Sequence, residues 1–264
     1  MTPCTPSDVR FFGALGLLGG LYVLLVAALI AADLSHTSPG AIARVFESRE
    51  IRSAVWLSLL SASTAAILAV WVAVPLGYLL ARTHFPGRAL VELLVDVPIV
   101  LPPTVVGLSL LVLFQTAPGA WVERHAVSVT YAVAGVVLAQ FTVSAAFATR
   151  TVRVVFEQID PRAEAIARTL GCSRAQAFWL VTLPEAWRGV LAAFTLAWAR
   201  AVGEFGPVLV FCGATRMRTE VLPTSVFLEL SAGNLDAALA VSLVMIGVAG
   251  VVLVLMRAAG LRSQ

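Results

Sequence analysis

Residues 160–184 have the sequence DPRAEAIARTLGCSRAQAFWLVTLP. This polar segment lies between two long apolar ones, and the interpretation of the whole chain depends on it. Asp160 can cap a helix N-terminus, and Pro161 suits the first helical position, where a backbone N–H has no partner in any case. Gly171 fits a position just past a helix end that needs positive φ. The segment therefore predicts a short, well-capped helix that ends at a glycine turn.

A second short helix is expected after that turn. Ser173 and Gln176 have the spacing of a capping box, and Pro184 falls where this helix passes into the next apolar span. Two short capped helices between apolar spans need something to pack against. The plainer alternative is a solvated amphipathic connector with no partner.

The composition of the chain places it in a membrane. Of its 264 residues, 59% are hydrophobic and only 12% are charged, which is rare for a soluble domain. The apolar excess falls in runs long enough to cross about 30 Å of hydrocarbon as helices. The sequence therefore predicts an all-α integral membrane protein with about six transmembrane helices and no sizeable soluble domain.

The predicted organisation follows from these runs. We expect an N-terminal transmembrane helix and outer loop over 1–53, a transmembrane domain over 54–257 that contains the 160–184 loop, and a cytoplasmic tail over 258–264. The six spans are expected at 11–32, 54–80, 90–114, 127–148, 189–211 and 237–256. A short helix over 223–230 is expected in the last outer segment, where a proline can start it.

The arginines indicate the orientation. The chain has 18 of them and no lysine. With both termini on the side of the 160–184 loop, eleven arginines lie on that side, six on the other and one inside a span. By the positive-inside rule the termini and the loop are cytoplasmic. The arginines are scattered over loops, without a basic stripe and interleaved aromatic residues, so nucleic acid is not an expected partner.

The third span is expected to be broken. The stretch DVPIVLPPTVVG, residues 96–107, has three prolines within six residues, which a regular helix does not accommodate. Carbonyls left without a donor must meet protein or water in a membrane, so we expect this segment to face the interior of the bundle. Asp96 is either a charge at a helix start, or part of a gate or of a contact with the 160–184 loop.

The fifth span carries charges that need an explanation. Arg200 and Glu204 are four residues apart, lie on one helix face and can pair, and a charge inside a span is costly unless it is paired or hydrated. Gly203 and Gly206, followed by Pro207, predict a break beside them. The pair is either a structural ion pair that fixes helix packing or a flank of the transport path.

Motifs for chemistry are missing from the chain. It contains no Gly-rich loop followed by Lys and Ser/Thr for phosphates, no HExxH and no Cys/His cluster. We therefore expect no catalytic residues, no metal site and no cofactor on this chain.

The sequence AEAIARTLGCSRAQAFWLVTLP, residues 163–184, closely resembles the EAA loop of permease subunits of ABC importers, with Ile166 where that pattern more often has Ala. The resemblance implies a cytoplasmic coupling helix that docks in a groove on a separate ATPase subunit, which would bind ATP and Mg²⁺. It implies ATPase-coupling roles for Glu164, Ala165, Ala167, Gly171, Leu183 and Pro184.

The stretches LPPTVVG, residues 101–107, and WARAVGEFGPVLVF, residues 198–211, resemble the permeases for molybdate, tungstate and sulfate among the type I importers. The resemblance places a candidate translocation path or core at Asp96, Pro102, Pro103, Arg200, Gly203, Glu204 and Gly206.

The same resemblance implies a function and partners. It favours import of molybdate or tungstate, with sulfate or thiosulfate as the alternative. The expected partners are the ATPase, a periplasmic or surface substrate-binding protein, a second permease copy in a homodimer, and lipid of a bacterial inner membrane. From other classes, a secondary transporter with Asp96 and Glu204 as ion carriers does not explain the 160–184 loop, and an intramembrane enzyme lacks a nucleophile–base pair.

Overall fold

The computed structural model describes residues 6–261, which form helices and loops and contain no strand. In chain order the elements are α1 (Pro6–His36), α2 (Pro39–Glu47), α3 (Arg49–Arg82), α4 (Arg88–Val100), α5 (Pro103–Gln115), α6 (Ala117–His125), α7 (Val133–Gln158), α8 (Pro161–Thr169), α9 (Arg174–Ala177), η1 (Phe178–Thr182, a π-helical segment), α10 (Leu183–Val202), α11 (Gly206–Cys212), α12 (Leu222–Ser231) and α13 (Leu235–Leu261).

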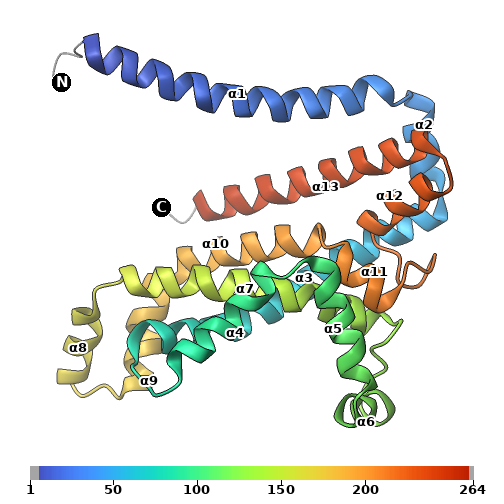
Figure 1. Cartoon of the computed structure of the whole chain (residues 1–264). Helices are drawn as coiled ribbons and strands as arrows, with labels where there is room; N and C mark the ends of the chain where they lie inside the picture. The colour runs from blue at the N-terminus through green and yellow to red at the C-terminus, as the bar shows by residue number, and fades with distance from the viewer. Residues whose placement is uncertain (1–5, 262–264) are drawn as a thin grey trace.

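The long helices account for the expected spans. Helices α1, α3, α7 and α13 are unbroken and are long and apolar enough to cross a membrane. Two bent pairs, α4 with α5 and the α9–α10 run with α11, bring the number to as many as six if each pair counts as one span. Figure 1 shows the long helices lying roughly side by side, with α8 and α9 at one end and α2 and α12 at the other. The start of α1 and the end of α13 lie at the α8–α9 end, which matches an even number of crossings.

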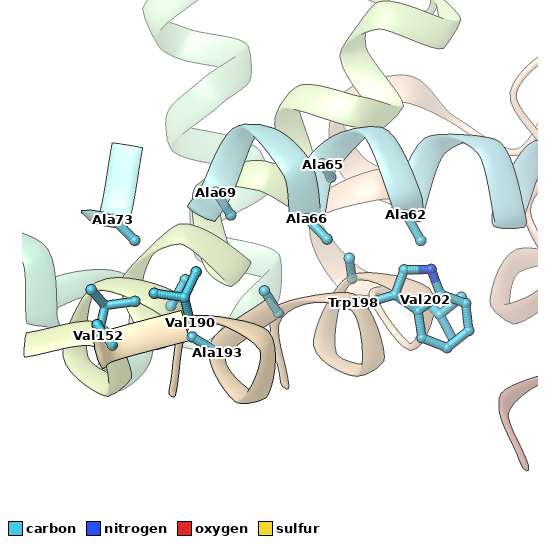
Figure 2. Packing of buried hydrophobic residues seen from close by; sticks show 14 of the residues in the cluster. Ala62, Ala65, Ala66, Ala69, Ala73, Val152, Val190, Ala193, Trp198 and Val202 are labelled. Atoms are coloured by element: carbon cyan, nitrogen blue, oxygen red, sulfur yellow. The ribbon is translucent and has the colours of Figure 1, made fainter. Parts of the chain in front are cut away.

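The centre of the bundle is the contact of α3 with α7 and α10. Helix α3 presents a face of small buried residues, which lets neighbouring backbones come close. Figure 2 shows this face opposite residues of α7 and α10, with labels on Ala62, Ala65, Ala66, Ala69 and Ala73 of α3 and on Val152, Val190, Ala193, Trp198 and Val202. Because lipid is as apolar as these side chains, close van der Waals packing holds the helices together.

Trp198 is the largest fully buried side chain in this core. Its indole Nε1–H donates to Ser63 Oγ of α3 at 3.2 Å. The polar edge of a buried tryptophan needs such a partner. The serine therefore has a specific role beyond its small size.

The expected outer loops contain helices. The segment expected as a loop after the first span holds α2, and Ser48 links it to α3, because Ser48 follows the last residue of α2 and its Oγ accepts from the Ile51 N–H at 3.3 Å. The outer loop after the third span likewise holds α6. The helix expected at 223–230 is confirmed as α12. Residues 258–261 of the expected tail 258–264 continue α13, and residues 1–5 and 262–264 lie outside the described range.

The expectation for the third span was partly wrong. The break occurs between α4 and α5, which meet at 116°, whereas Pro98 lies inside α4. Most of the segment does not face the interior of its own chain, because α4 buries no residue and Pro102 and Pro103 are exposed, but Val106 and Gly107 at its end are buried. A monomer thus leaves this broken element on its surface.

The end of the bundle opposite α8 and α9 holds a buried acid. Glu220, between α11 and α12, is 2% exposed, and its Oε1 accepts from Ser225 Oγ at 2.8 Å. Nearby, Arg216 and Glu229 form an ion pair at 2.7 Å. Burial raises the pKa of the Glu220 carboxyl above its usual 4.5, since its charged form loses hydration, and this outweighs the hydrogen bond from Ser225.

This raised pKa predicts a pH dependence of stability. As pH rises from 4.5 through the raised pKa, the folded protein still holds a proton that the unfolded chain has released, so the free energy of unfolding falls. Glu220→Gln keeps an acceptor for Ser225 and removes the titration. We expect the melting temperature of the variant to gain on wild type as pH rises above about 4.5.

Thermal unfolding in detergent measures this difference. The control variant is Glu185→Gln, at an exposed position, which should leave the pH profile as in wild type. A constant offset between Glu220→Gln and wild type over the whole pH range would show that Glu220 does not titrate there.

Candidate functional site

The segment 160–184 forms the two short helices that its sequence predicts, and α8 starts as expected. Asp160 precedes the helix in extended conformation, and its Oδ1 accepts from the Arg162 N–H at 2.9 Å. Pro161 occupies the first turn, where its missing N–H costs nothing. The N-cap is therefore confirmed.

Helix α8 ends in a Schellman motif around Gly171. This glycine has φ +98°, which a side chain would strain. Its N–H donates to the Arg168 carbonyl at 3.2 Å, and the next N–H, of Cys172, donates to the Ala167 carbonyl at 3.1 Å. Both hydrogen bonds of the motif are present, so the turn between α8 and α9 has a fixed shape.

The second short helix leads directly into the fifth span. The capping box is present, with Gln176 N–H donating to Ser173 Oγ at 3.2 Å and Ser173 N–H donating to Gln176 Oε1 at 2.8 Å. The Leu183 N–H then donates to the Phe178 carbonyl, five residues back. This π-helical turn stands just before Pro184, which has no N–H for the regular helical bond. Movement of α9 is thus transmitted into α10 without an intervening loop.

Glu164 fastens α8 to the bundle. Its Oε1 accepts a hydrogen bond from the Tyr78 hydroxyl of α3 at 2.7 Å. Its Oε2 lies 3.3 Å from the Thr182 hydroxyl of η1, which donates to it. One carboxylate therefore joins three segments that are far apart in sequence. A hollow of about 180 Å³ lies beside it, lined by Tyr78, Arg82, Thr83, Pro161, Glu164, Ala165, Arg168 and Arg174.

Aromatic packing holds Tyr78 in place. Its ring meets Phe156 of α7 edge-on at 5.5 Å between centroids and Phe178 of η1 at 4.8 Å. At the same level, Arg82 Nη2 donates to the Ile159 carbonyl at 2.7 Å, which joins the end of α3 to the end of α7. The base of α8 thus rests on α3, α7 and η1.

The outward side of α8 carries two large apolar side chains next to the exposed Arg162, Arg168 and Thr169. Ile166 is 59% exposed and Leu170 is 80% exposed, and residues four apart lie on one helix face. Neither Ile166 nor Leu170 was among the residues expected to couple; of those that were, Ala165 and Pro184 are exposed, whereas Ala167 and Leu183 are half-buried. The loop therefore offers apolar side chains beyond the end of the bundle, where an apolar patch marks a contact surface.

The two breaks meet each other, which sequence spacing alone did not indicate. A Cβ at Gly206 would lie 3.0 Å from Pro103 Cβ and from the Thr104 nitrogen. A Cβ at Gly107 would lie 2.8 Å from Pro207 Cα. Helices α5 and α11 therefore interlock through two glycines, so that a shift of one break displaces the other.

The predicted ion pair lies between the last turn of α10 and the start of α11. Arg200 Nη1 is 2.7 Å from Glu204 Oε2; Glu204 is buried, whereas the arginine side chain is 29% exposed. The guanidinium also lies over the Phe147 ring of α7 at 5.8 Å. Gly203 ends α10 and is exposed, and a Cβ there would find ordinary contact distances, so no steric demand selects glycine at this position.

Asp96 lies apart from the 160–184 loop and from the Arg200–Glu204 pair. It lies on α4, and its Oδ1 is 4.0 Å from Arg150 Nη1 of α7, with both side chains well exposed. An exposed pair at this distance contributes little. The structure brings Asp96 neither to the 160–184 loop nor to the Arg200–Glu204 pair among the contacts of the described residues.

A family model described as "Binding-protein-dependent transport system inner membrane component" matches residues 73–262. The chain belongs to this family. It is 37% identical over 244 residues to a probable molybdenum ABC transporter permease protein of Haloferax volcanii, covering 92% of this chain and 88% of that protein. It is 33% identical over 228 residues to the sulfate transport system permease protein CysT of Escherichia coli, covering 86% and 82%.

A solved structure shares the fold. The chain superposes with a TM-score of 0.77 and 16% identity on a chain of a bacterial ABC transporter involved in the import of the acidic polysaccharide alginate, covering 97% of this chain and 98% of that one. This binding-protein-dependent permease is therefore a multi-pass helical membrane protein of a transport system. The family match includes the 160–184 loop and both breaks, and α1 and α2 precede it.

The sequence did not predict which residues of this permease donate hydrogen bonds to Glu164. Tyr78 stands in an apolar span, where an aromatic residue signals no more than packing, and Thr182 stands among apolar neighbours in η1. Only the fold places them against the carboxylate. Among the described residues no group of three or more His, Cys, Asp or Glu side chains could hold a metal.

Because α5 and α11 pack closely at their breaks, adding one methyl group at Gly107 should destabilise the folded permease. Gly107→Ala would push a Cβ into the backbone of Pro207, and forcing atoms into a packed core costs about 1–3 kcal/mol. Gly247→Ala on α13 is the matched control, because nothing lies within 4 Å of a Cβ there. We expect Gly107→Ala to lower the melting temperature in detergent and Gly247→Ala to leave it unchanged or raise it; equal values would contradict the interlock.

Proposed function

We propose that this permease is the membrane-spanning subunit of an ATP-driven importer and that its α8–α9 loop docks on a separate ATPase subunit. The supporting observation is the loop itself, which is capped at each turn, fastened by Glu164 and exposes the apolar side chains of Ile166 and Leu170. ATP and Mg²⁺ would bind to the partner, and this chain would carry the mechanical coupling. The loop and both termini are then cytoplasmic, and the membrane is a bacterial inner membrane.

The transport path is proposed to form between two copies of the chain. Pro102, Pro103 and Gly203 are exposed on the monomer, and the Arg200 side chain is 29% exposed. Irregular backbone in hydrocarbon must meet protein or line a water-filled cavity. A homodimer that encloses these breaks satisfies that requirement and makes alternating access a movement of α5 and α11 against their counterparts.

The proposed cargo is a tetrahedral oxyanion, molybdate or tungstate, delivered by a periplasmic or surface binding protein. The molybdenum permease relative supports molybdate, and the sulfate permease relative supports sulfate or thiosulfate as the alternative. Arg200 is a permanent cation that attracts an anion, while Glu204 beside it limits the net charge so that a dianion is not held tightly.

Reconstitution tests the energy source and the cargo together. Proteoliposomes with the permease, its ATPase and its binding protein take up radiolabelled molybdate, with ATP supplied on the α8–α9 side and ionophores present. We expect uptake that requires ATP, persists without proton and sodium gradients, and resists a molar excess of sulfate. Uptake that follows a gradient and ignores ATP would identify a secondary transporter; competition by equimolar sulfate would identify a sulfate permease.

The outward side of α8 gives a direct test of docking. Leu170→Asp replaces a side chain whose burial is worth about 1.5–3 kcal/mol by a charge in the interface. We expect the ATPase to bind at least about 100-fold more weakly, measured by titration onto permease in nanodiscs. Val127→Asp, at an exposed apolar position outside the loop, is the control; unchanged ATPase affinity in Leu170→Asp would place docking elsewhere.

A further inference from the structure

Both carboxylate oxygens of Glu164 accept hydrogen bonds from within their own chain. The Tyr78 hydroxyl donates to one oxygen at 2.7 Å and the Thr182 hydroxyl donates to the other at 3.3 Å. Hydrogen bonds to an ionised acceptor are roughly twice as strong as neutral ones, and the Tyr78 bond has the short length typical of them. The carboxylate is thus committed to α3 and η1 in the isolated permease.

Helix α8 needs this attachment. It has nine residues, none of them buried, so it lacks a packed apolar face of its own to hold it against the bundle. The cap at Asp160 and the Schellman turn fix the shape of the helix, and both act within the 160–184 segment. The bond from Tyr78 is a direct side-chain tie from α8 to the long span α3.

The two donors are themselves held. Phe156 and Phe178 pack against the Tyr78 ring. Thr182 is 1% exposed and belongs to the π-helical turn that continues into α10. A pull on α8 therefore reaches α3 through Tyr78 and α10 through Thr182, the two helices whose small residues form the centre of the bundle.

We propose that Tyr78 and Thr182 are positioning residues for coupling: by holding the Glu164 carboxylate they make α8 move as one body with α3 and α10. This rests on the proposed function, since it assumes that an ATPase moves α8. The ATPase then contacts α8 at Ile166 and Leu170, and Glu164 transmits the movement of α8 to α3 and η1.

The test compares Tyr78→Phe and Thr182→Val, which remove one hydroxyl each and keep the shape of the side chain. Tyr22→Phe on the exposed α1 and Thr195→Val are the controls, because the Thr195 hydroxyl bonds only within its own helix, to the Leu191 carbonyl. For each variant in proteoliposomes with the ATPase and binding protein, ATPase affinity, ATP hydrolysis and the number of molybdate ions imported per ATP are measured.

We expect Tyr78→Phe to bind the ATPase as wild type does and to hydrolyse ATP, while molybdate imported per ATP falls about fivefold or more, the low end of typical coupling between sites. Thr182→Val should show a smaller fall, in keeping with its longer hydrogen bond. The double variant Tyr78→Phe/Glu164→Ala should couple no worse than Glu164→Ala alone, since both remove the same bond.

Two results would overturn the proposal. One is wild-type import per ATP in Tyr78→Phe; the other is a loss of ATPase affinity in Glu164→Ala that Tyr78→Phe does not share, which would mean that the carboxylate contacts the partner. Measurements on the wild-type permease distinguish these results from a failure of the proposed function. If the wild type neither binds an ATPase nor imports molybdate with ATP, the proposed function itself is wrong.

Discussion

Close packing of small side chains along α3 is the constraint on which the rest of the structure depends. In hydrocarbon, helices gain no hydrophobic energy by meeting one another, so their association relies on close contact. Ala62, Ala66, Ala69 and Ala73 provide that contact against α7 and α10. Since such packing tolerates little sliding, these three helices form a unit to which the remaining elements are attached.

The α8–α9 loop and the broken spans are attached to this unit in two different ways. The α8–α9 loop is fastened by polar bonds at its end, above all by Glu164, and it joins α10 without a loop. The broken helices α5 and α11 are interlocked by Gly107 and Gly206 at the other end of α10. Helix α10, with α11, thus connects the proposed docking site to the proposed transport path, and a single rigid element can serve both.

Much of this was predictable from the sequence. The long apolar runs predicted the spans, and Asp160, Gly171 and the Ser173–Gln176 pair predicted local hydrogen bonds that the structure confirms, because capping depends on residues a few positions apart. Contacts across long distances were not predictable. The meeting of Tyr78 with Glu164 and of Pro103 with Gly206 depends on helix register, and the exposure of the third-span break depends on a surface that a single chain leaves open.

Distance measurements between spin labels test whether α8 is rigidly attached to the bundle. Labels at Glu157→Cys on α7 and Thr169→Cys on α8, both at exposed positions, are placed in a chain whose native cysteines are replaced, within the transporter assembled with and without an ATP analogue. If α8 moves as one body with the bundle, the intrachain distance changes by less than about 2 Å while the distance between the two copies of residue 169 changes by more. An intrachain change as large as the change between copies would contradict it.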